Sequence, residues 1–303
     1  MKVCFNSEED IFIHADGSIS KCALLWSIKQ IKPSHLSIPI EQCENICGIK
    51  CDRISSINIL LGYKCVDGCS CCGDHLIFKN LNSVFKDISK VNLDSIMQSF
   101  NLILDKHKTV KYIQIGSYFD STYNIKYLSQ LINKISEQVN LPIQIYHMGI
   151  TSLTDLYSKL TDKSIKQACF IINLNGTKNI HNKYKPNTYD VIMKNIVSNN
   201  KKLNIKVNTL LFEDSFDELE DIFNVLEYIS NYVEELEIKI DNCITRLNKF
   251  RISKTIIFLK AFLYKKSIKS KKLHQAISNC INDNGKKSKF ILTLANNIEK
   301  LNI

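Results

Sequence analysis

Three cysteines in one short loop are the residues of this chain whose types and spacing best indicate chemistry. The segment LGYKCVDGCSCC, residues 61–72, places Cys65, Cys69 and Cys72 in a C-x3-C-x2-C arrangement. Thiolates are soft ligands that suit iron–sulfur clusters and zinc. A structural zinc site or an ordinary four-iron cluster takes four protein ligands, so three thiolates leave one metal corner open. The loop therefore predicts a metal centre that binds a substrate or cofactor directly.

The elements around the loop are expected to form an α/β fold. Alternating apolar runs and amphipathic stretches predict a parallel sheet, doubly wound or curled into a barrel, with ligands at the carboxyl ends of its strands. The cysteine loop leaves the carboxyl end of the first of these strands. The expected strands are 54–63, 110–115, 142–148, 168–174, 205–212 and 233–240, and the expected helices are 93–107, 122–138, 151–161, 188–201 and 216–230.

The cysteine spacing resembles that of the radical S-adenosylmethionine (radical SAM) enzymes, over roughly residues 54–242. The resemblance implies a partial (β/α)6 barrel of the TIM type and a [4Fe-4S] cluster whose open iron chelates SAM. It also implies reductive cleavage of SAM to a 5′-deoxyadenosyl radical that abstracts hydrogen from a substrate. An electron donor such as flavodoxin or ferredoxin would supply the electron.

Two further segments extend the resemblance to SAM-binding residues. IGSYFDS, residues 115–121, takes the place of a Gly-rich acidic segment, although it departs from the common Gly-Gly-Glu form. The resemblance assigns Gly116 and Ser117 to its backbone part and Asp120 to the acid that holds the SAM amino group. Cys71 stands where an aromatic residue usually lies near the adenine. It is either a fourth thiolate or, as we favour, a small hydrophobe whose backbone passes the adenine.

Residues 171–196 resemble the fourth-strand segment of members that modify peptides and sugars. Asn173 and Asn175 stand at the end of this strand, where polar side chains of the family approach the SAM ribose and carboxylate, and they are predicted to do so here. The same resemblance implies a peptide or sugar-type substrate. The other matching positions are Leu174, Gly176, His181, Asn182, Lys185, Tyr189 and Asp190.

A second cysteine group lies near the N-terminus. IFIHADGSISKC, residues 11–22, and CENICGIKC, residues 43–51, resemble the start of the SPASM-like or twitch-like extension that binds auxiliary clusters, which usually follows the barrel. A second [4Fe-4S] cluster is predicted on Cys22, Cys43, Cys47 and Cys51, with Cys4 as a substitute ligand. Structural zinc on the same thiolates and unliganded thiols remain alternatives. Asp16-Gly17 is a hairpin turn signal that explains the first phrase without a cofactor.

The net charge of +10 belongs to the C-terminal segment. Residues 246–303 hold 14 Lys+Arg against 2 Asp+Glu, which leaves 26 against 28 in residues 1–245. We therefore expect three parts: a cysteine-rich module (1–53), a core (54–242) and a basic, helical tail (243–303). The tail favours an anionic small molecule or an acidic peptide, and nucleic acid is not favoured because no recognised motif accompanies the charge.

The sequence also indicates a compartment and the roles of the isolated cysteines and histidines. No apolar run of about 18 residues and no secretory signal are found, so the cytoplasm is expected. Cys169, Cys243 and Cys280 are isolated and are expected to be buried small hydrophobes. His147 and His181 follow strands and are expected to be hydrogen-bonded bystanders. Two alternatives to an enzyme remain: a non-catalytic iron–sulfur or zinc scaffold, and a degenerate radical SAM fold that binds a partner.

Overall fold

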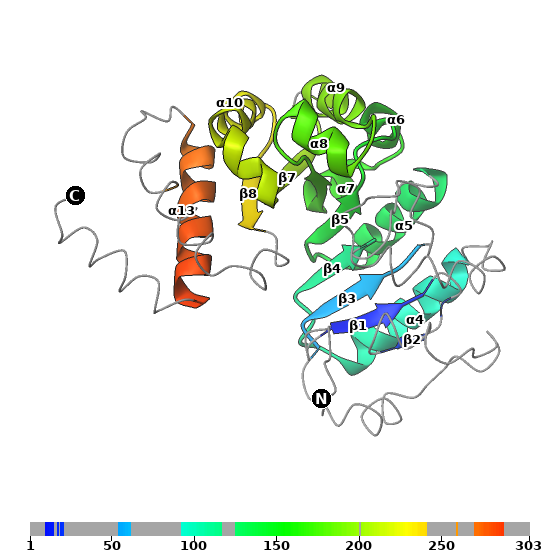
Figure 1. Cartoon of the computed structure of the whole chain (residues 1–303). Coiled ribbons are helices and arrows are strands. Elements are labelled where there is room, and N and C mark those ends of the chain that lie inside the picture. Colours follow the sequence, from blue (N-terminus) through cyan, green and yellow to red (C-terminus); the bar gives the residue numbers. More distant parts are fainter. Residues whose placement is uncertain are drawn as a thin grey trace, which may run out of the picture. The chain divides into compact units, whose positions relative to one another are not determined.

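The chain forms an α/β structure around one hydrogen-bonded sheet (Figure 1). The computed structural model describes residues 10–14, 17, 19–20, 54–61, 92–116, 125–199, 201–240, 259 and 270–287. The strand order is β2-β1-β3-β4-β5-β6-β7-β8. The pairs β1–β3, β3–β4, β4–β5 and β7–β8 are parallel, and β2 pairs antiparallel with β1 at one end of the order.

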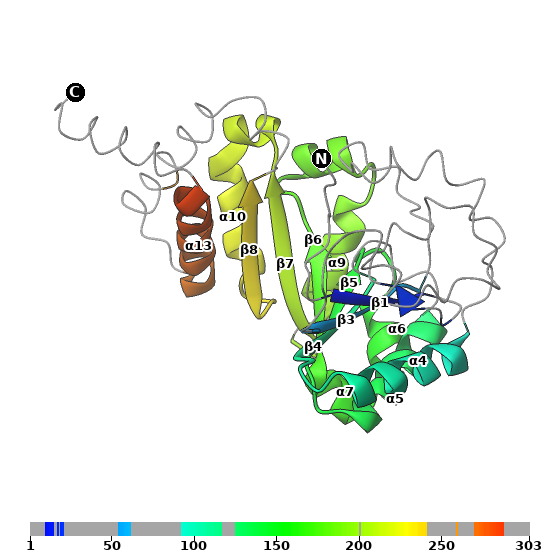
Figure 2. The same ribbon diagram turned by 90° about the horizontal axis from the view of Figure 1, so that it is seen from below.

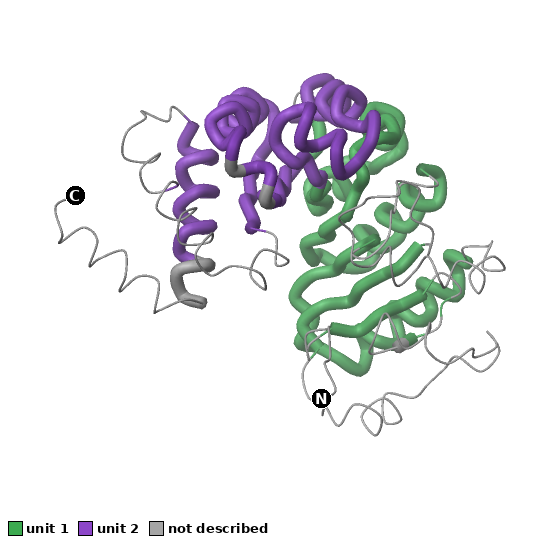
Figure 3. The backbone as a smooth tube through the Cα atoms, viewed as in Figure 1, with its two compact units in different colours: residues 1–171, 202–204 green, residues 172–201, 205–303 purple. Residues whose placement is uncertain are grey.

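The chain divides into two compact units. Unit 1 comprises residues 1–171 and 202–204, and unit 2 comprises residues 172–201 and 205–303 (Figure 3). The boundary falls within β6 (Ala168–Asn173), so the last two residues of that strand belong to unit 2.

Unit 1 is built from parallel strands and the helices that cover one face of them. Its strands are β1 (Asp10–Ile13), β2 (Ile19–Ser20), β3 (Ser56–Ile59), β4 (Tyr112–Ile115) and β5 (Ile143–His147). Its helices are α4 (Leu93–Lys106), α5 (Ile125–Gln138), α6 (Leu153–Tyr157) and α7 (Asp162–Gln167). Figure 2 shows all four helices on the same side of these strands.

Alternation along the strands of unit 1 explains which face is covered. Successive side chains of a strand point to opposite faces. The isoleucines at alternate positions of β3, β4 and β5 are fully buried and pack against the apolar stripes of the helices. These isoleucines are Ile57, Ile59, Ile113, Ile115, Ile143 and Ile145. The opposite face carries polar side chains, and Asn58, Gln114 and Gln144 lie in register there.

Unit 2 continues the strand–helix alternation. After β6 come α8 (Lys178–Tyr184), α9 (Tyr189–Asn199), β7 (Asn204–Leu211), the 3-10 helix η4 (Glu213–Glu218), α10 (Leu219–Ile229), β8 (Glu235–Ile240) and α13 (Lys271–Lys287). Figure 2 shows α10 and α13 beside β8. The buried side of α13 consists of Leu273, Ala276, Ile277 and Cys280.

The structure confirms the expected α/β fold and all six expected strands. Within the described strands the order has two ends, so the sheet does not close into a barrel. The expected helix 151–161 is shorter and is followed by the separate helix α7, and α8 had not been predicted at all. The structure also confirms a helix in the basic tail and a buried Cys280, whereas Cys169 is only half-buried.

The N-terminal phrase with Asp16-Gly17 forms a hairpin, as the turn signal predicted. β1 and β2 pair antiparallel, Gly17 has φ +88°, and its N–H donates to the His14 carbonyl (2.9 Å). β1 also pairs in parallel with β3, which places residues 10–13 in the sheet. The proposed division of the chain at residues 53 and 242 stays a prediction. Within the described ranges, no helix is long and apolar enough to span a membrane.

Candidate functional site

The carboxyl ends of β1, β3 and β4 are joined by backbone hydrogen bonds in unit 1. The Leu60 N–H donates to the Ile13 carbonyl, and the Gly116 N–H donates to the Ile59 carbonyl, both at 2.9 Å. Leu61 is the last described residue after β3, and Cys65 is four residues further along the chain. The cysteine loop thus begins at an edge where three strand ends meet, which is where ligands gather in parallel sheets.

Most of the predicted site residues lie outside the described residues. The described ranges contain no group of three or more His, Cys, Asp or Glu that could hold a metal ion. The residues predicted to bind SAM or metal that lie outside these ranges are Ser117, Asp120, Cys71, Cys65, Cys69, Cys72, Cys22, Cys43, Cys47 and Cys51. They stay predictions.

Gly116 is the described part of the Gly-rich segment. It follows β4 directly, is buried, and has φ +74°, a left-handed conformation that favours glycine. Its N–H donates to the Ile59 carbonyl at 2.9 Å, which fixes the backbone at the end of β4. The absence of a Cβ lets another molecule approach the backbone closely, which fits the role that the sequence assigned to it.

Asn173 is the last residue of β6 and Asn175 follows it by two residues, and the two have different surroundings. Asn173 is exposed, so its carboxamide is accessible to a ligand. Asn175 is 3% exposed, and its Oδ1 accepts from the Leu210 N–H at 3.4 Å. The two residues therefore differ in what they can do: Asn173 can bind a ligand as it stands, whereas Asn175 links the end of β6 to β7.

His181 holds the loop after β6 in place. The Asn175 N–H donates to its Nδ1 (3.0 Å), so Nδ1 is unprotonated and Nε2 carries the hydrogen, which is directed at Thr188 Oγ1 (2.9 Å). The Thr188 hydroxyl donates in turn to the Lys185 carbonyl (2.9 Å). Burial, with a smaller contribution from the charge of Lys185, lowers the pKa of His181 from 6.5 to about 4. His181 is therefore a neutral, hydrogen-bonded residue, as expected.

Three neighbouring residues of the same motif also stabilise the loop after β6. Asn182 Oδ1 accepts from the Tyr189 N–H at 3.2 Å, at the first residue of α9. Gly176 has φ +78°, and a Cβ there would lie 2.6 Å from Ile222 of α10. Thr177 begins α8 and accepts from the Ile180 N–H at 3.3 Å. The fourth-strand motif thus fixes the backbone that presents Asn173.

His147 plays a comparable part at the end of β5 in unit 1. Its Nδ1 accepts from the Gly149 N–H (2.8 Å), and its Nε2 lies 3.2 Å from Thr151 Oγ1. Its ring also meets that of Phe170 edge to face. Burial lowers the pKa of His147 from 6.5 to about 3. The ring is neutral near pH 7 and stabilises the turn after β5.

We expect the two histidines to weaken the fold in acid. Because their folded-state pKa values lie below 6.5, the unfolded chain binds protons first as the pH falls. Their stabilisation is complete above pH 6.5 and is lost as the pH falls toward 4 for His181 and 3 for His147. Each should cost about 2 kcal/mol of unfolding free energy between pH 6.5 and 5.

Urea denaturation at pH 7, 6 and 5 measures this loss. His147→Asn keeps an acceptor for the Gly149 N–H but removes the titrating ring, so its unfolding free energy should fall less steeply with acid than that of the wild type. Equal slopes for the two proteins would contradict the assignment.

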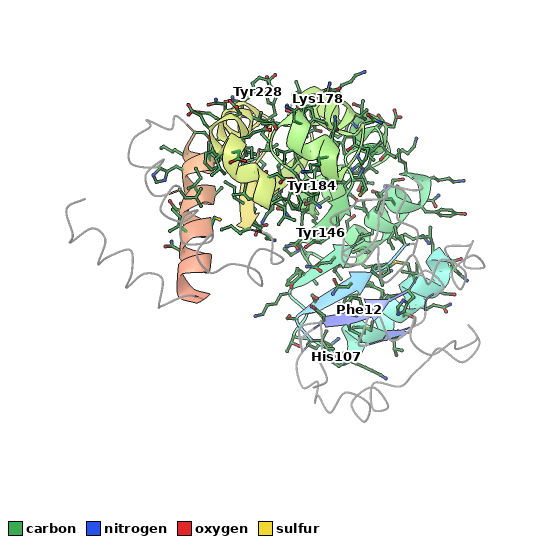
Figure 4. The ribbon with its side chains drawn as sticks, viewed as in Figure 1. Phe12, His107, Tyr146, Lys178, Tyr184 and Tyr228 are labelled. Carbon is green, nitrogen blue, oxygen red and sulfur yellow. The ribbon has the colours of Figure 1, made fainter. Side chains whose placement is uncertain are left out.

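A rigid cluster borders the carboxyl end of β7. Tyr184 of α8, labelled in Figure 4, stacks on Phe212 with ring centroids 3.8 Å apart. The Tyr184 hydroxyl donates to Asp214 at 3.0 Å, and Lys183 pairs with the same carboxylate. The hydrogen bond from Lys183, followed by that from Tyr184, lowers the pKa of Asp214. This cluster attaches α8 to the segment around η4.

Polar side chains line one face of β7 and β8, which sequence reasoning did not single out. Lys206 lies 2.9 Å from Glu235 and 3.1 Å from Glu237, and Lys239 lies 3.2 Å from Glu237. Asn208 lies between these groups, opposite Glu237. The sequence did carry a signal for this polar face. In IKVNTLLF, residues 205–212, Lys206 and Asn208 stand two positions apart within an otherwise apolar run, which is the alternation typical of a strand with one polar face.

No protein-family model and no curated protein sequence matches the chain. Among solved structures, spore photoproduct lyase complexed with dinucleoside spore photoproduct has 12% identity and a TM-score of 0.48, over 60% of this chain and 61% of that one. Streptococcus suis SuiB bound to S-adenosylmethionine has 10% identity and a TM-score of 0.45, over 69% of this chain and 43% of that one. TYW1 with a lysine-pyruvate adduct bound has 17% identity and a TM-score of 0.42, over 67% and 70%. Such identities and TM-scores support no statement about the reaction or substrate of this chain.

Proposed function

We propose that this chain is a radical SAM enzyme that holds a [4Fe-4S] cluster on Cys65, Cys69 and Cys72. The observation that carries the proposal is the position of these three cysteines. They follow β3, a confirmed strand whose carboxyl end is hydrogen-bonded to the ends of β1 and β4. Three thiolates with one open iron at such an edge suit a cofactor that brings its own amine and carboxylate.

Two described residues have surroundings that suit the SAM-binding roles proposed for them. In unit 1, Gly116 presents backbone without a side chain at the end of β4. In unit 2, Asn173 offers an accessible carboxamide at the end of β6. Ser117 and Asp120 are proposed for the SAM amino group and Cys71 for backbone passage beside the adenine. Asn175 is proposed to act with Asn173.

Bound SAM and the cluster together would supply a 5′-deoxyadenosyl radical. The task of the chain's own residues is to bind and orient the cofactor and to exclude water. The segment after β6 supports a role in orienting the cofactor, because His181 and Asn182 fix the loop that follows Asn173. The proposal includes an electron donor such as flavodoxin or ferredoxin and a cytoplasmic setting.

The substrate and a second cluster are finer parts of the proposal. The resemblance of residues 171–196 favours a peptide or sugar-type substrate, and the basic tail favours one that carries negative charge. Cys22, Cys43, Cys47 and Cys51 are proposed to hold an auxiliary [4Fe-4S] cluster. Zinc on the same thiolates is the alternative that metal analysis would identify.

Anaerobic reconstitution tests the proposed function. The full-length protein is reconstituted with iron and sulfide, reduced with dithionite and given SAM. We expect formation of 5′-deoxyadenosine and methionine, together with a change in the electron paramagnetic resonance signal of the reduced cluster when SAM is added. An intact cluster that cleaves no SAM would leave the scaffold alternative, and stoichiometric zinc without iron would overturn the proposal.

A further inference from the structure

Three carboxamide side chains form a row on the polar face of unit 1. Asn58 of β3 lies opposite Gln114 of β4, and Gln114 lies opposite Gln144 of β5 (Figure 1). Neighbouring strands of a sheet are about 4.8 Å apart, so the three amides stand side by side. Gln114 Nε2 donates to Gln144 Oε1 at 3.3 Å. These three residues, here called the amide row, therefore present donors and acceptors at one level of the sheet.

A chain of hydrogen bonds fixes the orientation of Asn58. The Ser56 hydroxyl donates to the Asp10 carboxylate, so the Ser56 oxygen is left to accept from Asn58 Nδ2, at 2.9 Å. Asn58 Oδ1 then remains as an acceptor, and none of the described residues donates to it. Asn58 is only 1% exposed, and buried polar atoms are nearly always hydrogen-bonded. This oxygen is therefore suited to a donor that a ligand brings.

The hydrogen bond between the two glutamines gives the amide row a polarity. Gln114 uses one N–H on Gln144 and keeps its Oε1 as an acceptor. Gln144 uses its Oε1 and keeps both N–H groups of its carboxamide as donors. Both side chains are only half-buried, so these groups are accessible to a ligand. The amide row thus offers acceptors on β3 and β4 and donors on β5.

A peptide bond matches this order of donors and acceptors. Its N–H and C=O point in opposite directions from one rigid plane, so it can place its N–H toward Gln114 and its carbonyl toward Gln144. A hydroxyl acts as donor or acceptor at either place, so the polarity of the amide row would not select for it. The carboxylate of Asp10, which is linked to the row, already accepts from Ser56. The amide row therefore favours a neutral amide over a hydroxyl or a charged group.

The amide row lies next to the strand ends from which the cysteine loop and the Gly-rich segment continue. Asn58 stands two residues before Leu60, and Gln114 stands two residues before Gly116. Two residues of a strand span about 7 Å. All four residues belong to unit 1. A ligand bound to the amide row therefore lies about 7 Å from the edge at which the proposed cluster loop begins.

We propose that the amide row holds a peptide bond of the substrate, with Gln114 Oε1 accepting from its N–H and Gln144 Nε2 donating to its carbonyl. This inference rests on the proposed function and narrows its substrate to a peptide. Asn58 Oδ1 accepts from a further N–H of the same peptide. Because hydrogen bonds at both ends fix the peptide plane, the amide row orients the substrate for hydrogen removal.

Deuterium transfer tests the proposal on the reconstituted, full-length protein. A hydrogen that the 5′-deoxyadenosyl radical removes ends in 5′-deoxyadenosine, so a deuterated substrate labels that product. The protein is given SAM, dithionite and either a perdeuterated protein digest or a perdeuterated oligosaccharide mixture, at subsaturating concentration. Mass spectrometry of 5′-deoxyadenosine should show deuterium from the peptide pool and none above background from the sugar pool.

Gln144→Glu removes the proposed donor and keeps the rest of the amide row. The carboxylate has nearly the same size and still accepts from Gln114 Nε2, but it offers no N–H to a peptide carbonyl. The deuterated fraction of 5′-deoxyadenosine from the peptide pool should fall about tenfold, because the substrate carbonyl is left facing a carboxylate. Total 5′-deoxyadenosine should stay near the wild-type level, since Gln144 has no proposed contact with SAM.

Two further variants complete the design. Gln98→Glu makes the same chemical change at an exposed glutamine of α4, and it should leave the deuterated fraction unchanged. Gln144→Met removes the carboxamide without adding a charge, and it should lower the deuterated fraction as Gln144→Glu does. The methionine variant also covers the case in which the glutamate variant fails to fold.

The proposal is overturned if the sugar pool labels 5′-deoxyadenosine as strongly as the peptide pool, if neither pool labels it, or if Gln144→Glu keeps the wild-type fraction. The proposed function fails separately, if the reconstituted wild type forms no 5′-deoxyadenosine at all.

Discussion

Replacing Cys65, Cys69 and Cys72 together by alanine is expected to abolish 5′-deoxyadenosine formation. Each thiolate holds one iron, and a cluster without its ligands cannot transfer an electron to SAM. Iron analysis of the anaerobically reconstituted variant, alongside chromatography of the products, checks the result. About four irons should remain if the auxiliary cluster is real, since a second cluster would keep its own ligands. Product at the wild-type level would refute the assignment of these residues.

Two single substitutions sharpen this experiment. Cys169→Ala removes a half-buried cysteine that lies outside both cysteine groups, and it should keep both iron content and product formation. Cys71→Ala separates the two interpretations of that residue, because a fourth ligand would be lost with the cluster whereas a small hydrophobe would not. Retained iron in Cys71→Ala therefore supports the open-iron site.

Gly17→Ala is expected to cause a large loss of stability in unit 1. Its φ of +88° costs a non-glycine residue about 1–2 kcal/mol. A Cβ there would also lie 2.4 Å from Ser95 Cβ and 2.6 Å from the Ser95 backbone carbon of α4. Because a helix backbone cannot yield as a side chain can, the hairpin must move away from α4. We expect a total of about 3 kcal/mol or more, measured by urea denaturation.

Ser99→Ala provides the graded control for this substitution. Ser99 Oγ donates to the Gly17 carbonyl, so its removal cancels one contact between α4 and the hairpin without any steric clash. The expected loss is about 1 kcal/mol. If Gly17→Ala cost no more than Ser99→Ala, the close approach between hairpin and helix would be wrong.

The sequence allowed the strands to be predicted because their apolar runs are long and rich in β-branched residues. The helices that it missed are short or irregular. α7 has six residues and α8 has seven, too few for a clear period of 3.6. β1 pairs with β3 across more than forty residues, and no local pattern reports such a partner. The hairpin after β1 was accessible, since Asp16-Gly17 is a local signal.

The site shows the same division between local and non-local information. The motif after β6 was visible in the sequence, and the hydrogen bonds by which His181 and Asn182 fix the loop join residues of that same motif. The position of Asn208 beside the end of β6 was overlooked because it depends on the neighbouring strand. Only the register with Leu174 shows that Asn208 lies beside Asn173. Spacing along one strand cannot supply that relation.

The short antiparallel strand β2 also bears on how the chain avoids self-association. An unpaired sheet edge is a template on which strands of other molecules can add. Here β2 pairs with the outer side of β1 through Phe12–Ser20 and Ile13–Ile19, and β1 in turn covers β3. Removing the first 53 residues to isolate the strand–helix core would strip both strands and leave the buried, isoleucine-bearing β3 as a bare edge. The hairpin thus protects the core against aggregation, independently of any metal bound by the N-terminal cysteines.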